Sequence, residues 1–302
     1  MFVSWIKIFG AYVTATILYN KREMNTRDEH MRVGEAESRL DHCGTGKVRL
    51  YVEADLGKGL GVVPNRDQIH YLLNVMRMGD GDHVRLFNGR DGEWLGRLDE
   101  VKKRSCLIAL EKKTREQDAL PDIWLLFAPV KRARLDFMVQ KAVEMGAGRL
   151  LPVNTARTNV ARIKQDRLRA NAVEAAEQCG LLSVPEVEEP QSLESLLRKW
   201  TANMGGRRII FCDEAAPKAS TLEQLQGLGG AGPQTDPQTD PQTGPLAILI
   251  GPEGGFSPAE REQLLNRDDT HAISLGPRVM RADTAAVAAL AAIQLVLGDW
   301  RG

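Results

Sequence analysis

Two strand–glycine loop–helix units lie in succession between residues 246 and 297, and they constrain the fold more than any other feature of the chain. The first unit begins with the apolar run Leu246–Ile250, which is typical of a strand buried on both faces. Three glycines follow within Gly251–Gly255, and glycine permits both sharp turns and the close approach of a ligand. The segment Ser257–Glu260 then has the capping-box pattern of a helix start.

The second unit repeats this arrangement. A short strand is predicted over Ala272–Leu275, a glycine loop over Gly276–Thr284 and an alanine-rich helix from about Ala285 to Leu297, with Gly298 as its stop. Ligands in open α/β sheets bind beside loops at the carboxyl ends of strands, so two such loops predict one shared pocket. Neither loop has the glycine spacing of a dinucleotide site or of a phosphate-binding loop, which makes a Rossmann oxidoreductase a poor alternative.

Composition indicates a globular protein of two domains, because the chain has 302 residues, 43% of them hydrophobic and 26% charged. The four cysteines form no C-x-x-C pair, which favours reduced thiols in the cytoplasm and disfavours a zinc site. The five histidines also lack metal-ligand spacing, so no metal is expected.

Net charge is zero, but the charges are unevenly distributed. Residues 131–169 hold ten Lys or Arg against three Asp or Glu, whereas residues 170–195 hold six Glu and no Lys or Arg. The basic block is consistent with a surface that binds a polyanion, and equally with a solvated face that pairs with the acidic segment.

Two segments differ from the rest of the chain. Residues 1–46 are expected to be a disordered leader, or to precede a true start at Met31; the apolar stretch Phe2–Tyr19 leaves a membrane anchor as the alternative. Residues 227–245 contain the near-repeat PQTD-PQTD-PQTG, which is rich in Pro and Gly and is expected to be a solvated insertion.

Residues 47–116 read as a small β-rich domain. Alternating strands, a short helix over Asp67–Met78 and the hairpin signal Asn88–Gly92 predict a meander with a basic rim, which suits RNA binding or protein contacts. From residue 120 onward, strands are predicted near 123–130, 150–153 and 207–212, with helices over 131–146 and 164–179. The first of these helices has one apolar face, formed by Leu135, Met138, Val139, Ala142 and Val143.

The motifs GPEGGFSPAE and LGPRVMRADTAA resemble the two C-terminal signatures of the bacterial 16S ribosomal RNA uridine-N3 methyltransferases of the SPOUT superfamily. The resemblance covers roughly residues 47–302 without the PQTD segment. It implies an α/β fold, a trefoil-knotted domain (residues 120–302) that binds S-adenosylmethionine, preceded by a small PUA-like β-barrel domain. It also implies a homodimer that modifies a uridine of 16S rRNA in the small ribosomal subunit, with no metal and no membrane.

The resemblance also implies site residues. Backbone groups of both loops are expected to hold the cofactor, and these are Gly251, Pro252, Glu253, Gly254, Gly255, Leu275, Gly276, Val279, Met280 and Thr284. Arg281 is the expected charged group nearest the target base, and Lys131 follows a strand end and faces the same edge. Asp283 is a candidate proton acceptor or, alternatively, a helix cap.

Contacts to RNA are expected from Arg49, His70 and Arg77, which match family motifs. The chain departs from the family at Leu181, where an arginine is usual, and Arg157 or Arg162 could replace that arginine as a phosphate contact. This departure leaves two alternatives open: a SPOUT methyltransferase acting on another RNA position, or an RNA-binding or assembly protein with weakened catalysis.

Overall fold

The computed structural model describes residues 48–159, 163–203, 206–216, 220–228 and 244–301. The chain divides into two compact units, Met1–Val48 and Arg49–Gly302, and the description below concerns the second. The expected leader, most of the PQTD segment and Arg162 lie outside the described residues.

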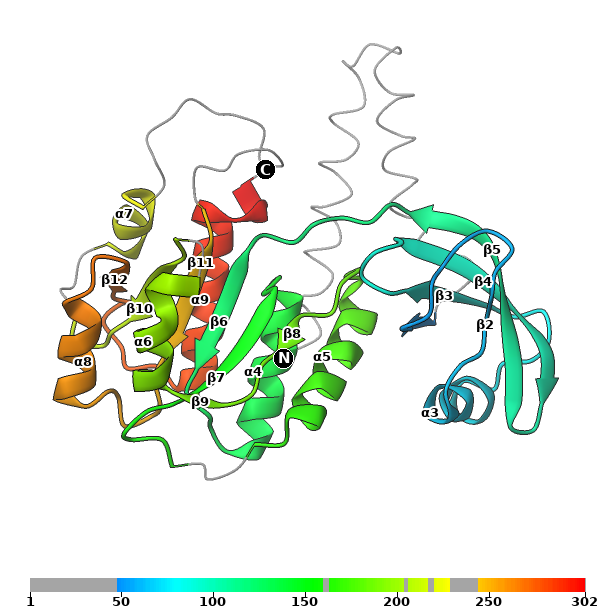
Figure 1. Ribbon diagram of the computed structural model, residues 1–302, viewed down its shortest axis with the longest axis horizontal. Helices are drawn as coiled ribbons and strands as arrows, with labels where there is room; N and C mark the ends of the chain where they lie inside the picture. Colours follow the sequence, from blue (N-terminus) through cyan, green and yellow to red (C-terminus); the bar gives the residue numbers. More distant parts are fainter. Residues whose placement is uncertain (1–47, 160–162, 204–205, 217–219, 229–243, 302) are drawn as a thin grey trace, which may run out of the picture. The chain divides into compact units, whose positions relative to one another are not determined.

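Within the described residues, five strands form the sheet of the β domain in the order β1–β3–β4–β5–β2 (Figure 1). They are β1 (Arg49–Tyr51), β2 (Gly61–Val62), β3 (His83–Phe87), β4 (Glu93–Lys102) and β5 (Ser105–Arg115). The predicted hairpin is confirmed, because β3 pairs antiparallel with β4 across Asn88–Gly92. The predicted helix is α3 (Arg66–His70), which continues directly into the π-helical turn η3 (Tyr71–Val75).

The α/β domain is built on a parallel sheet of seven described strands, in the order β12–β10–β11–β6–β7–β8 with β9 paired to β7. The strands are β6 (Ile123–Phe127), β7 (Arg149–Asn154), β8 (Glu186–Val187), β9 (Gln191–Ser192), β10 (Arg208–Cys212), β11 (Leu246–Ile250) and β12 (Thr270–Ile273). The helices are α4 (Arg132–Glu144), α5 (Gln165–Cys179), α6 (Leu193–Asn203), α7 (Thr221–Gln226), α8 (Pro258–Leu265) and α9 (Ala282–Leu297), followed by the 3-10 turn η5 (Asp299–Arg301).

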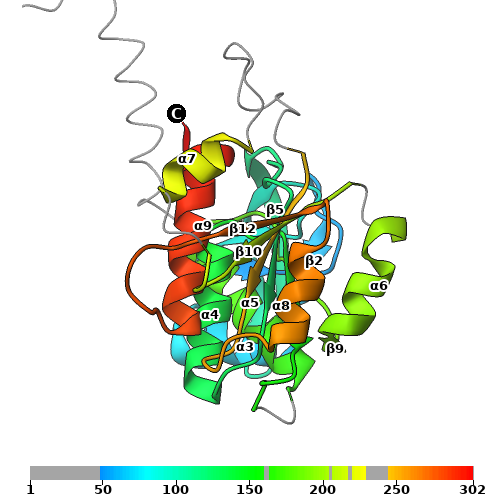
Figure 2. The same ribbon diagram turned by 90° about the vertical axis from the view of Figure 1, so that its left-hand side faces the viewer.

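Helices cover both faces of this sheet, which explains why β11 is apolar at every position (Figure 2). Leu246, Ile248 and Ile250 pack into the hydrophobic core under α4, α5 and α9. Ala247 and Leu249 point to the opposite face and pack into the core under α6 and α8. An α/β fold with a parallel sheet and a separate β domain is therefore confirmed, whereas the trefoil knot stays a prediction.

Local features of the sequence determine several helix ends. The five residues predicted for the apolar face of α4 are all buried. The capping box at the start of α8 is present, since the Ser257 hydroxyl accepts from the Glu260 N–H and the Glu260 carboxylate accepts from the Ser257 N–H. Helix α9 starts at Ala282, three residues before the predicted start, and ends at Gly298 in an extended conformation.

Candidate functional site

Loops that follow β10, β11 and β12 meet at one edge of the sheet, because parallel strands present their carboxyl ends together. In the described part of the chain these loops enclose a cavity of about 260 Å³, slightly below the usual range for small-molecule sites of about 300–1,000 Å³. The lining residues are Cys212–Ala215, Ile250–Glu253, Gly255, Phe256, Arg261, Ser274–Met280, Ala282 and Ala285. The predicted shared pocket is thus present, and a third loop contributes to it.

Glycine is required at three positions of this wall. A Cβ on Gly251 would lie 2.5 Å from Cε2 of the Phe256 ring. Gly255 has φ +66° and Gly276 has φ +108°, and side chains are disfavoured in that backbone region. Backbone without side chains therefore forms part of the cavity wall at these three positions.

The loop after β11 is held from outside the cavity by neighbouring elements. Arg134 on α4 forms an ion pair with Glu253. Nη1 of Arg157 donates to the Gly254 carbonyl at 2.7 Å, and the Glu260 carboxylate accepts from the Ala156 N–H at 2.7 Å. These contacts join the loop after β11 to α4 and join the loop after β7 to Gly254 and α8, so neighbouring elements support this part of the cavity wall.

Helix α7 holds the loop after β12 in the same way. The Thr221 hydroxyl donates to the Ser274 carbonyl at 2.6 Å, and the Gln224 side chain accepts from the Ser274 N–H at 3.3 Å. Ser274 is itself buried, and its hydroxyl accepts from the Gly276 N–H at 3.3 Å. Helix α7 was not predicted from the sequence, although it supports one wall of the cavity.

Eight of the ten predicted cofactor residues line the cavity, and all ten fall in the described ranges. Gly254 faces outward instead, where a Cβ would lie 3.6 Å from Cβ of Arg157. Thr284 is exposed in the first turn of α9.

None of the three predicted catalytic residues lines the cavity in the described structure. Arg281 is the exposed N-cap of α9, next to the lining residue Met280. Asp283 lies in the first turn of α9, where its carboxylate accepts from the Thr284 N–H at 3.1 Å. Lys131 is the exposed N-cap of α4. All three lie at the same edge of the sheet as the cavity, but α9 contributes lining residues whereas α4 contributes none.

Among the lining residues that the sequence analysis missed, five have charged or aromatic side chains, namely Asp213, Glu214, Phe256, Arg261 and Arg278. The first two directly follow the predicted strand 207–212, so the same carboxyl-edge argument could have found them. Asp213 is buried and accepts from Nε of Arg261 at 2.8 Å and from the Ala215 N–H at 3.0 Å. Burial raises the pKa of the neighbouring Cys212 thiol to about 12, which leaves it neutral and unsuited to act as a nucleophile.

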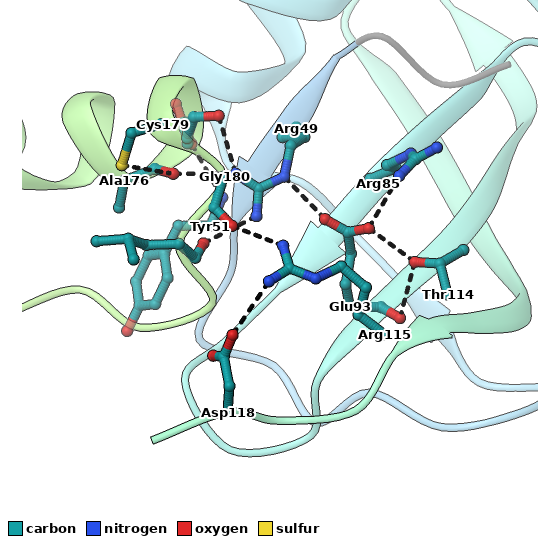
Figure 3. A network of polar contacts seen from close by, with 12 residues as sticks. Arg49, Tyr51, Arg85, Glu93, Thr114, Arg115, Asp118, Ala176, Cys179 and Gly180 are labelled. Carbon is teal, nitrogen blue, oxygen red and sulfur yellow. Dashed lines mark hydrogen bonds and ion pairs between the residues drawn. The ribbon is translucent and has the colours of Figure 1, made fainter. Parts of the chain in front are cut away.

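Arg49 occupies a different environment from the one the resemblance implies (Figure 3). Its side chain is 12% exposed, and its Nε donates to Glu93 at 2.8 Å. Its other nitrogens donate to the carbonyls of Ala176, Glu177 and Leu181 at the C-terminal end of α5. Arg49 therefore joins the β domain to α5, and this position does not favour RNA contact.

Two further arginines extend this junction. Arg115 donates to the Gly180 carbonyl at 2.6 Å, and Arg85 forms a second ion pair with Glu93 at 3.1 Å (Figure 3). Burial alone would raise the pKa of Glu93, but hydrogen bonds from Thr114 and Arg49 outweigh burial and hold that pKa below its usual value.

The other predicted RNA residues are exposed. His70 contacts the Asn74 amide at 2.8 Å, and Arg77 has the unusual φ of +56° just after η3. Leu181, where the family has arginine, packs against the hydrophobic core of the α/β domain. In this chain position 181 is therefore a packing position.

The described residues give two further negative findings. No helix among them is both long and apolar enough to cross a bilayer. No set of three or more His, Cys, Asp or Glu side chains among them is arranged to hold a metal ion.

Fold and site together define an α/β protein with a backbone-walled ligand cavity and an attached small β domain. The chain belongs to the family of RNA methyltransferase domains, whose model matches residues 116–294, and the RNA methyltransferase PUA domain matches residues 64–111. It is similar to ribosomal RNA small subunit methyltransferase E of Bacillus subtilis, with 30% identity over 77% of this chain and 91% of that protein. The corresponding Rickettsia conorii protein is 25% identical over 82% of this chain and 95% of its own length.

Solved structures agree with this assignment. The ribosomal RNA small subunit methyltransferase E of Neisseria gonorrhoeae, crystallised with S-adenosylmethionine, aligns with a TM-score of 0.70 and 25% identity over 84% of this chain and 99% of that one. A Legionella pneumophila protein described as a putative methyltransferase, also in complex with S-adenosylmethionine, aligns with a TM-score of 0.69 and 26% identity over 83% of this chain and 98% of that one.

Proposed function

We propose that this protein transfers a methyl group from S-adenosylmethionine to nitrogen 3 of a uridine in 16S rRNA of the small ribosomal subunit. The observation that carries the proposal is the cavity at the carboxyl edge of the sheet, walled by Gly251, Gly255 and Gly276. Relatives of the same family hold S-adenosylmethionine, and the carboxyl edge of an open α/β sheet is where such ligands bind.

When bound, the cofactor supplies an electrophilic methyl group on a sulfonium, and the carbon–sulfur bonding pair stays on sulfur as the methyl moves to nitrogen 3. The protein must hold the two reactants in line, which is mainly a matter of proximity. The neutral imide of uridine is a poor nucleophile, so its N–H proton has to pass to water before nitrogen 3 attacks the methyl group. We assign Arg278, which lines the cavity, and Arg281, which follows the lining residue Met280, to stabilising the uridine anion electrostatically.

Basic side chains at the same edge support an RNA substrate. Lys131, Arg157, Arg278 and Arg281 are exposed there, and phosphate neutralisation by such groups supplies most of the sequence-independent affinity for RNA. On the β domain, His70 and Arg77 remain the proposed RNA contacts. We accordingly keep the division into an RNA-binding domain, residues 47–116, and a catalytic domain, residues 120–302.

The test is transfer of tritiated methyl from S-adenosylmethionine to 30S subunits and, in parallel, to bare 16S rRNA lacking the modification. We expect incorporation into one uridine, with mass mapping of nuclease fragments placing the methyl on the base. Incorporation on a ribose hydroxyl would support a methyltransferase acting on another RNA position, and binding without transfer would support an RNA-binding or assembly protein.

We further propose that the active form is a cytoplasmic homodimer with a trefoil-knotted catalytic domain. Large exposed side chains on α9 and just after it, Leu295 and Trp300, are 58% and 44% exposed and offer an apolar surface to a second copy. Light scattering coupled to size-exclusion chromatography should give twice the chain mass, and a monomer at micromolar concentration would contradict the dimer.

A further inference from the structure

The carboxylates that line the cavity differ in whether a cationic side chain pairs with them. Among the described residues, Asp213, Glu214 and Glu253 line it. Asp213 is bound to Arg261, and Glu253 is paired with Arg134. Glu214 has no hydrogen-bond or ion-pair partner within the described ranges, so its negative charge is available to a ligand.

Backbone geometry places Glu214 at the wall rather than away from it. It follows β10 in a turn in which Asp213 accepts from the Ala216 N–H at 3.1 Å. Its Oε1 lies 3.1 Å from the position that a Cβ on Gly255 would take. The carboxylate therefore rests against the glycine loop after β11, where the absence of a side chain gives it room.

The sulfur atom of the cofactor loses its positive charge during the proposed reaction, so a carboxylate without a partner can distinguish the cofactor from its product. The sulfonium of the methyl donor is a cation, whereas the thioether left after transfer is neutral at sulfur. A carboxylate held at the cavity wall attracts the sulfonium and has no such attraction for the neutral thioether. We propose that Glu214 is a specificity-determining residue that favours S-adenosylmethionine over S-adenosylhomocysteine and thereby assists product release; this rests on the function proposed above.

Calorimetric titration of the full chain with each ligand tests the proposal. Glu214→Gln should weaken S-adenosylmethionine binding about threefold to fivefold, the effect expected of one partly exposed charge pair, and leave S-adenosylhomocysteine within about twofold. The difference should shrink at high salt, because ions screen an exposed carboxylate. Glu262→Gln is the matched control: this glutamate is exposed on α8 near the cavity but does not line it, so both affinities should be unchanged.

Each other outcome has a defined meaning. An equal loss for both ligands would show that Glu214 binds a part common to both, such as the ribose, and would overturn the selection role. Unchanged affinities would overturn it as well. Because Glu214 is exposed, the melting temperature of the variant should match that of the parent, which separates loss of binding from loss of fold. Failure of the parent protein to bind either ligand would instead refute the proposed function.

Discussion

Replacing Gly251 by alanine is the most direct test of how the cavity wall is built. The added Cβ would lie 2.5, 3.0 and 3.1 Å from three atoms of the Phe256 ring. Ordinary carbon–carbon contact starts near 3.5 Å, so the ring has to move by roughly 1 Å. That ring packs edge-to-face on Phe211, with centroids 4.9 Å apart, and contacts the core under α6 and α8.

Overpacking of this kind costs about 1–3 kcal/mol of unfolding free energy. Gly254→Ala is the matched control, because its Cβ would meet only Arg157 atoms, at 3.6 and 3.7 Å, which is ordinary contact. Both substitutions restrict the unfolded chain in the same way, so this contribution cancels in the comparison. Gly251→Ala should also weaken cofactor binding, since Phe256 lines the cavity, whereas Gly254→Ala should leave binding nearly unchanged.

Urea denaturation followed by fluorescence gives the two free energies, and calorimetry gives the two affinities. Phe256→Ala combined with Gly251→Ala completes a double-mutant cycle, in which the cost of Gly251→Ala should largely disappear. If Gly251→Ala were no more destabilising than Gly254→Ala, the packing of Phe256 against Gly251 would not control the loop, and this reasoning would be wrong.

Three further predictions concern the contacts between the β domain and α5 and the arginines beside the cavity. Arg49→Ala should lower the unfolding free energy by about 3 kcal/mol at pH 7, because it leaves the buried Glu93 carboxylate with one cation fewer. The pKa of Glu93 is depressed in the folded state, so this loss should shrink as pH falls below about 4. Denaturation at several pH values checks both statements. Glu177→Gln should raise the melting temperature at pH 7–8 but not near pH 4, since burial raises the pKa of Glu177 and its charged form opposes folding as pH rises through that pKa. Arg281→Ala and Arg278→Ala should each reduce methyl transfer at least tenfold with unchanged calorimetric affinity for the cofactor, and full turnover would exclude the residue concerned.

Sequence reasoning recovered the parts of the fold that depend on local pattern. The strand Leu246–Ile250, the capping box Ser257–Glu260 and the apolar face of α4 each follow from residue periodicity or a short motif, and each is confirmed. The strand-end argument also located the cavity, because a parallel sheet brings loops distant in sequence to one edge.

What the sequence did not reveal depends on contacts between distant segments. The pairing of Asp213 with Arg261 and the support of Ser274 by α7 join elements 48 to 53 residues apart. Arg49 illustrates the same limit, since its partners on α5 lie more than 120 residues along the chain. A basic residue on a strand can face solvent or a helix end, and the motif alone does not distinguish these environments.

The arginine contacts at the end of α5 bear on how modular this enzyme family is. A helix C-terminus leaves its last carbonyls without partners, and here Arg49 and Arg115 from the β domain supply the donors. Isolated expression of residues 120–302 would expose those carbonyls together with the apolar surface around Leu181. Chimeras that exchange the β domain between relatives should therefore fold well only when the donor brings both arginines, or when the end of α5 is exchanged with it.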